Sequence, residues 1–142
     1  MVSKFRREGY ALFVIRPHAI LPQFDVVWVT KYRCKVLQGP MRERIREIII
    51  QTCNEIGVYI VKGVLGRDHV HMFLSSIPPM LSLSVVMQRI KGRSSRRIQM
   101  ELPQLRKRYW GRRFWARGYF STTSGNVTDD IIEPYLELHS VK

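Results

Sequence analysis

Two histidines separated by one residue, His69 and His71, lie within an apolar run that continues to Leu74. The residue types of this run are those of a buried or half-buried strand, on which successive side chains point to opposite faces of the sheet. His69 and His71 are therefore expected on one face, with Cα atoms roughly 6.6 Å apart. Two neutral imidazoles at that spacing can bind one metal ion if another element supplies a third ligand. Two ordinary half-buried histidines, each satisfied by a hydrogen bond, would give the same short pattern.

A candidate third ligand, His139, lies near the end of the chain. Asn126 is a favourable helix N-cap and acidic residues follow it in the first turn, which predicts a terminal helix. On that helix Tyr135 and His139 are four residues apart, so the phenol and the imidazole share a face. Pro134 removes one backbone hydrogen bond and predicts a kink beside Tyr135. A helix that simply packs both residues on the sheet is the alternative interpretation.

A basic segment, residues 89–117, contains eleven Lys and Arg against the single acid Glu101, and so carries +10 of the formal net charge of +13. Trp110 and two further aromatic residues are interleaved with these charges, a mixture typical of proteins that bind single-stranded nucleic acid through phosphate contacts and base stacking. A solvated helix face is the alternative for any charge run. Lys31 and Arg33, at the end of the first core strand, are further predicted DNA contacts. The predicted contacts within the segment are Arg89, Lys91, Arg93, Arg96, Arg97, Arg106, Lys107, Arg108, Trp110, Arg112, Arg113 and Arg117.

The length of 142 residues and the hydrophobic share of 45% predict one globular domain with an ordinary core. The excess of positive charge points to a polyanionic partner, with nucleic acid favoured over an anionic membrane. Cys34 and Cys53 form no disulfide framework, which indicates a reducing compartment. No apolar run approaches the roughly 20 residues that a membrane span needs. We therefore expect a soluble, cytoplasmic protein.

The elements that must position these residues follow from periodicity and turn signals. Residues 1–22 are predicted to be a basic arm with at most one short strand, because two prolines interrupt it; residues 23–142 form the single domain. Within the domain the predicted order begins with strand 24–30 and a helix that follows Gly39-Pro40 and ends at the C-cap Gly57. Strands 58–65 and 69–76 come next, joined as a hairpin, and then helix 83–98, strand 114–122 and the terminal helix. This βαββαβ order is that of a ferredoxin-like α+β fold, with an antiparallel sheet and helices on one face. Since that fold hosts many functions, function has to be argued from the site.

The combination of a strand-borne His-apolar-His and a late helical tyrosine resembles the HUH single-tyrosine transposases, the small TnpA-like enzymes that move insertion sequences as single-stranded DNA. The resemblance covers nearly the whole chain from Val26. The segments that carry it are Val27-Trp28-Val29-Thr30-Lys31-Tyr32-Arg33, Asp68-His69-Val70-His71, Arg89-Ile90-Lys91-Gly92-Arg93-Ser94-Ser95-Arg96, Tyr109-Trp110, Phe114-Trp115, Arg117-Gly118-Tyr119-Phe120, Gly125-Asn126-Val127-Thr128 and Tyr135-Leu136.

The resemblance implies that Tyr135 is the nucleophile, which attacks a phosphodiester to leave a 3′-hydroxyl and a 5′-phosphotyrosine. It also implies a divalent metal, Mg²⁺ or Mn²⁺, held by His69, His71 and His139. The family usually has Gln at the position of His139, and three imidazoles suit Zn²⁺ or Mn²⁺ better than Mg²⁺. Asp25 replaces a residue that is commonly His in relatives, and no role follows for it.

The resemblance further implies DNA hairpins as partners and a homodimer with active sites completed in trans. The small residues of segment 121–125, between the last predicted strand and the tyrosine helix, would permit that exchange of helices. Two alternatives remain from sequence: a domesticated relative that nicks hairpins without transposing, and a non-catalytic ferredoxin-like nucleic-acid-binding module whose histidines are structural.

Overall fold

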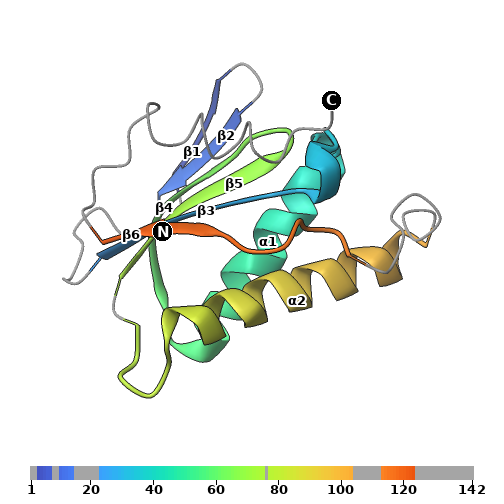
Figure 1. Ribbon diagram of the computed structural model, residues 1–142. Coiled ribbons are helices and arrows are strands. Elements are labelled where there is room, and N and C mark those ends of the chain that lie inside the picture. Colours follow the sequence, from blue (N-terminus) through green and yellow to red (C-terminus); the bar gives the residue numbers. More distant parts are fainter. Residues whose placement is uncertain (1–2, 8–9, 15–22, 76, 104–112, 124–142) are drawn as a thin grey trace.

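The computed structural model describes residues 3–7, 10–14, 23–75, 77–103 and 113–123. The chain forms a single antiparallel sheet with two long helices on one side (Figure 1). Its elements are β1 (Ser3–Arg7), β2 (Tyr10–Val14), β3 (Gln23–Val29), the 3₁₀ turn η1 (Lys31–Arg33), α1 (Gly39–Ile56), β4 (Tyr59–Leu65), β5 (His69–Ser75), α2 (Leu83–Glu101) and β6 (Phe120–Thr122).

The order of strands across the sheet is β1-β2-β4-β5-β3-β6, and every neighbouring pair is antiparallel. The run β3, α1, β4, β5, α2, β6 reproduces the predicted βαββαβ order, with β5 between β4 and β3, and β3 between β5 and β6. The ferredoxin-like fold is therefore confirmed. A central position matters for function, because side chains on β3 and β5 have neighbours on both sides and are held more firmly than side chains on an edge strand.

The N-terminal arm contains two strands, so the expectation of at most one is wrong. β1 pairs with β2, and Ala11–Val14 of β2 pairs with β4. Both prolines of the arm follow residue 14, so they do not interrupt the paired stretch. The hairpin covers the edge of β4, which would otherwise present unpaired backbone groups.

The last predicted strand, residues 114–122, is much shorter than expected. Only Phe120–Thr122 pairs with β3, and Trp115 makes an isolated bridge to Thr30. Between these points Gly118 has a left-handed φ of 77°, which no extended strand accommodates. The carbonyl oxygens of Ala116 and Gly118 accept hydrogen bonds from the Lys91 ammonium of α2. A side chain of the helix thus replaces the strand partner that the sequence pattern led us to expect.

The core lies between the sheet and the two helices. Val26 and Trp28 of β3 and Val70, Met72 and Leu74 of β5 belong to one buried cluster with the apolar faces of α1 and α2. Because strand side chains alternate, the residues between them lie on the opposite face of the sheet. That face carries His69 and His71.

The first helix follows its sequence signals. Pro40 lies in its first turn, and Gly57 caps it with a left-handed φ of 79°. Cys53 is fully buried within the core, and burial raises the pKa of its thiol to about 12, as expected for an inert structural cysteine. Within the described residues, no helix is long and apolar enough to cross a membrane.

Candidate functional site

His69 and His71 share the sheet face that points away from the helices, as the spacing predicts. In the antiparallel register His69 lies opposite Val29 of β3, and His71 lies opposite Val27. The His69 side chain is 12% exposed and His71 is 9% exposed, so both rings are largely shielded from water. The His71 ring packs against Phe73, with ring centroids 4.6 Å apart. The two imidazoles are therefore held on β5, which is paired on both sides, with β3 and with β4.

Asp68, in the turn before β5, determines how the His69 ring is oriented. Its Oδ1 lies 2.9 Å from Nδ1 of His69, and its Oδ2 accepts a hydrogen bond of 2.9 Å from Nε of Arg33. Burial works to raise the pKa of Asp68, but the hydrogen bond from His69 and the charge of Arg33 outweigh it, so the pKa lies below its usual value. A carboxylate only accepts hydrogen bonds, so Nδ1 of His69 must carry the proton. The other ring nitrogen, Nε2, is the one left with a lone pair for a metal ion.

The backbone around Asp68 is fixed by Thr30, the residue that follows β3. The amide of Thr30 donates to the carbonyl oxygen of Asp68 at 2.9 Å. Its hydroxyl lies 3.2 Å from the same carbonyl oxygen and 2.7 Å from that of Cys34. Thr30 is fully buried. Asp68 thus belongs to a polar cluster that joins the end of β3 to the start of β5, and sequence reasoning missed it. An acid directly before the first histidine was the available signal.

Gly66 gives the His69 ring the space that it occupies. A Cβ at this position would lie 2.4 Å from Cε1 of His69, well inside van der Waals contact. Gly66 also donates a backbone hydrogen bond to the carbonyl oxygen of His69 at 2.9 Å, which closes the turn between β4 and β5. The ring therefore rests directly on the backbone, and any side chain at position 66 must displace it.

The histidine pair fits a divalent ion that accepts imidazole nitrogen. Metal-binding histidines commonly donate their second ring nitrogen to a carboxylate, as His69 does to Asp68. Two imidazoles do not complete a site, and the described ranges contain no group of three His, Cys, Asp or Glu that could hold a metal. The predicted third ligand His139 and the predicted nucleophile Tyr135 lie outside the described residues.

Asp25, for which the sequence suggested no role, lies on the same face as the histidines. It is fully buried in β3, opposite Phe73 of β5 on one side and Thr122 of β6 on the other. Since His71 lies opposite Val27, Asp25 and His71 are diagonal neighbours across the strand pair. A buried carboxyl group beside the candidate metal ligands is unusual for the centre of a sheet.

The predicted DNA contacts of α2 fall into two groups. Arg89, Arg93 and Arg96 are exposed, although Arg93 also pairs with Glu55 of α1. Arg97 is half-buried and donates to the side chain of Gln51 at 3.0 Å. These pairings tie α2 to α1 and leave the exposed guanidinium groups to face solvent.

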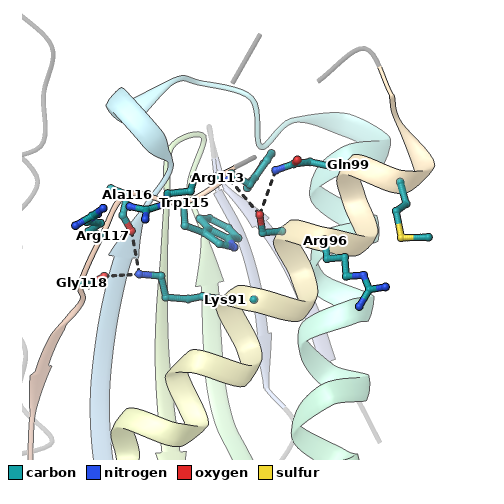
Figure 2. Close-up of a pocket in the computed structure, with 12 residues that line it drawn as sticks. Lys91, Arg96, Gln99, Arg113, Trp115, Ala116, Arg117 and Gly118 are labelled. Atoms are coloured by element: carbon teal, nitrogen blue, oxygen red, sulfur yellow. Dashed lines mark hydrogen bonds between the residues drawn. The ribbon is translucent and has the colours of Figure 1, made fainter. Parts of the chain in front are cut away.

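Lys91 is engaged differently from the arginines. Its ammonium donates to the carbonyl oxygens of Ala116 at 2.9 Å and Gly118 at 2.7 Å, and so fastens the segment before β6 to α2 (Figure 2). Burial, together with the charge of Arg113, lowers the pKa of Lys91 to about 8. Two of its three donors are used within the protein. Its first role is therefore structural.

A cavity of about 980 Å³ opens between α2 and residues 113–118. Figure 2 shows Trp115 between the helix and this segment, with Arg96, Arg113 and Arg117 around the opening. Nε1 of Trp115 donates to Oγ of Ser94 at 2.8 Å, which locks the indole in place. The result is a cationic hollow with a rigid aromatic wall. The remaining predicted contacts, namely Arg106, Lys107, Arg108, Trp110 and Arg112, lie outside the described residues.

The fold and this face together define a ferredoxin-like domain with two oriented histidines on one side of its sheet and a strongly basic surface on its second helix. Residues 20–139 match the family of IS200-like transposases, and the chain belongs to this family. The family is one of single-tyrosine transposases, so the chain is an enzyme of DNA transposition, as its motifs suggested. The family assignment favours the enzyme over the alternative of a non-catalytic binding module.

Named transposases are similar in sequence over most of the chain. The transposase for insertion sequence element IS200 of Salmonella typhimurium is 34% identical over 118 residues, which span 81% of this chain and 77% of the relative. The ISDra2 transposase TnpA of Deinococcus radiodurans is 29% identical over 115 residues, 81% of each chain.

Solved structures share the architecture. A crystal structure assigned to a transposase of Deinococcus radiodurans aligns with a TM-score of 0.78 at 25% identity, over 89% of this chain and 97% of that one. A REP-associated tyrosine transposase bound to a REP hairpin aligns with a TM-score of 0.56 at 14% identity, over 93% of this chain and 67% of that one, which is a likeness of fold.

Proposed function

We propose that this transposase binds hairpins in single-stranded DNA and cleaves and rejoins the strand through a 5′-phosphotyrosine on Tyr135. The observation that carries the proposal is the pair His69 and His71, held on one sheet face with the tautomer of His69 set by Asp68. A structural histidine pair would not need a buried carboxylate and an arginine arranged to orient one ring.

The chemistry proposed for Tyr135 is a transesterification. The phenolic oxygen forms a bond to phosphorus while the bond to the 3′-oxygen breaks, and the departing 3′-oxygen takes up a proton. A tyrosine of pKa about 10 is only about a thousandth ionised at neutral pH, so nearby cations are needed to favour the phenolate. Because the phenolate is also a good leaving group, a 3′-hydroxyl can later reverse the step and join a new strand without an energy source.

His69, His71 and His139 would hold a divalent metal, Mg²⁺ or Mn²⁺, with Zn²⁺ possible for three imidazoles. When bound, such an ion polarises the scissile phosphate and offsets developing negative charge. This chain's own residues orient the ligands: Asp68 fixes the proton on Nδ1 of His69, and Gly66 admits the ring. The shielding of both rings from water would strengthen every electrostatic contact made there.

The basic surface would hold the DNA. Arg89, Arg96, Arg113 and Arg117 are exposed on α2 and on the segment packed against it, where they can reach phosphates. The cavity lined by Trp115 has room for part of a nucleotide. Hairpin recognition is supported by the REP-associated transposase, which has the same fold and is bound to a hairpin.

The active sites are proposed to be shared within a homodimer. The small residues of segment 121–125, Ser-Thr-Thr-Ser-Gly, begin within β6. Those that follow Thr122 lead to the tyrosine segment and are small enough to let it reach a neighbouring subunit. Tyr135 and His139 would move together, because they are one helical turn apart. His69 and His71 of one subunit would then meet both residues of the other.

The test uses single-stranded DNA from the ends of the protein's own insertion element. Wild-type protein with Mn²⁺ should become covalently attached to the 5′ end of a cleaved strand, whereas Tyr135→Phe should bind the hairpin with near-normal affinity and form no adduct. An adduct that persists in Tyr135→Phe would assign the nucleophile elsewhere. Mixing His69→Ala with Tyr135→Phe subunits should restore cleavage if sites are shared in trans, and a dead mixture would contradict the sharing.

A further inference from the structure

Tyr32, in the turn η1 between β3 and α1, has a backbone conformation that a bulky residue rarely adopts. Its φ is 58° and its ψ is 19°, and the next residue, Arg33, has a φ of 51°. Left-handed conformations at two consecutive non-glycine residues are costly. Such strain persists only where the surrounding structure enforces it, and it is concentrated at functional sites.

A side-chain contact accounts for the left-handed backbone of Arg33, whereas burial of the side chain does not account for that of Tyr32. Arg33 turns back so that its guanidinium binds Asp68, the residue that orients His69. Tyr32 is 53% exposed, so its ring is not held in the turn by burial in the core. The turn therefore presents a large aromatic side chain to solvent on a rigid backbone.

Tyr32 follows the end of β3 that pairs with the His69 end of β5. It follows Val29 by three residues, and Val29 lies directly opposite His69 in the sheet. Nζ of Lys31 lies 5.4 Å from the centroid of the Tyr32 ring. The Tyr32 ring is exposed, has a cation beside it, and is next in sequence to Arg33, which is linked through Asp68 to His69. It therefore has the composition of a platform for a base and its phosphate.

We propose that the Tyr32 ring stacks on an unpaired base of the single strand that enters the His69–His71 site, with Lys31 near the adjoining phosphate. This inference rests on the proposed function and adds a binding site to it. Stacking on an aromatic face does not depend on base identity, so Tyr32 would position the strand without choosing its sequence.

The test compares two oligonucleotides that have the same phosphates but differ in bases. A labelled oligothymidylate of about 12 nucleotides, within the length that single-strand binding sites span, is titrated by fluorescence anisotropy without added metal. An abasic strand of equal length is titrated in parallel. The dissociation constant of the abasic strand divided by that of the oligothymidylate isolates the contribution of the bases, because phosphate contacts are common to both strands.

Loss of one stacking contact should reduce that ratio roughly fivefold or more. Tyr32→Leu should show this reduction, and Tyr32→Phe should retain the wild-type ratio. Tyr59→Leu is the matched control, because Tyr59 is 42% exposed but pairs with Ser75, at the opposite end of β5 from His69. Tyr32→Asn should lose stacking while melting at or above the wild-type temperature, since Asn tolerates the left-handed conformation better than Tyr.

The outcomes separate the two proposals. An unchanged ratio in Tyr32→Leu, with normal binding of both strands, would overturn the assignment of Tyr32 alone. A lower melting temperature in Tyr32→Asn with an unchanged ratio would assign Tyr32 a purely structural role. Wild-type protein that binds neither strand at low salt would contradict the proposed function itself.

Discussion

Replacing Gly66 with Ala should impair the histidine site more than it impairs the fold. The added methyl carbon would lie 2.4 Å from Cε1, 2.7 Å from Nδ1 and 2.9 Å from Nε2 of His69. Carbon atoms in contact lie roughly 3.5–4.0 Å apart, so the ring must move by about 1 Å or more. Gly66 has no left-handed φ, so alanine strains no backbone angle there. The perturbation is therefore confined to the orientation of one imidazole.

The displacement breaks a specific contact. The hydrogen bond from Nδ1 of His69 to Asp68 is 2.9 Å long, and a shift of about 1 Å takes it beyond hydrogen-bonding distance. Loss of the partner that orients a metal ligand typically costs about 10–100-fold in metal affinity or activity. A misplacement of about 1 Å near reacting groups is enough to lower a rate about 100-fold. We expect Mn²⁺ affinity and single-turnover cleavage to fall by factors in this range.

Calorimetry with Mn²⁺ and a single-turnover cleavage assay measure the two effects, and urea denaturation measures the free energy of unfolding. Gly92→Ala is the matched control: Gly92 is in α2 and a Cβ there would meet nothing within 4 Å. That variant should be stabilised by about 1 kcal/mol, with unchanged metal affinity. Wild-type Mn²⁺ affinity and cleavage in Gly66→Ala would refute the claim that the pose of His69 matters for the site.

Three further predictions concern charged groups. Asp68→Asn should lower metal affinity about 10–100-fold by calorimetry. The lowered pKa of Asp68 stabilises the wild-type fold at pH values above the unfolded-state pKa, and this stabilisation is lost as the pH falls through the folded-state pKa, so the variant should lose stability less steeply in acid. Because folding lowers the pKa of Lys91 from 10.5 to about 8, the unfolded chain binds more protons than the folded chain between these pH values. The free energy of unfolding measured in urea should therefore rise with pH across that window more for the wild type than for Lys91→Met. Arg117→Ala should reduce the slope of log affinity against log salt for single-stranded DNA by about 0.7, whereas Arg44→Ala should leave it unchanged, because Arg44 pairs with Glu101 and Glu47. A flat salt response in the wild type would mean that the basic surface faces another partner.

The sequence predicted the parts of the site that follow from periodicity. Alternation along residues 69–75 requires His69 and His71 to share a face, and the structure puts them there. The apolar face of α1 and its glycine cap were equally predictable from the sequence, because both depend on local spacing. These features use short-range rules that a single sequence contains in full.

The features that escaped prediction depend on contacts between distant segments. Asp68 gains its role only because the left-handed turn after β3 brings Arg33 to it from 35 positions away. Lys91 was grouped with the phosphate contacts, although its ammonium is bound to two carbonyl oxygens more than twenty residues further on. Residues 114–119 were expected to continue the last strand, yet Gly118 has a left-handed φ of 77°, and the carbonyl oxygens of Ala116 and Gly118 accept hydrogen bonds from Lys91. Residue type shows what a side chain can do, but not which of its possible partners lies within reach.

The β3–β5 strand pair links stability to reactivity in this enzyme. β3 and β5 send Trp28 and Met72 into the core between the sheet and the helices, and the same two strands present Asp25, His69 and His71 on the other face. A change on the helix side that shifts β5 would therefore move the histidines as well, because both sets of side chains share one backbone. At the end of β3 the chain leaves this rigid frame through two left-handed residues, and there it gives Arg33 to Asp68 and exposes Tyr32. The strained turn thus lies where the fixed part of the site meets the strand that it has to hold.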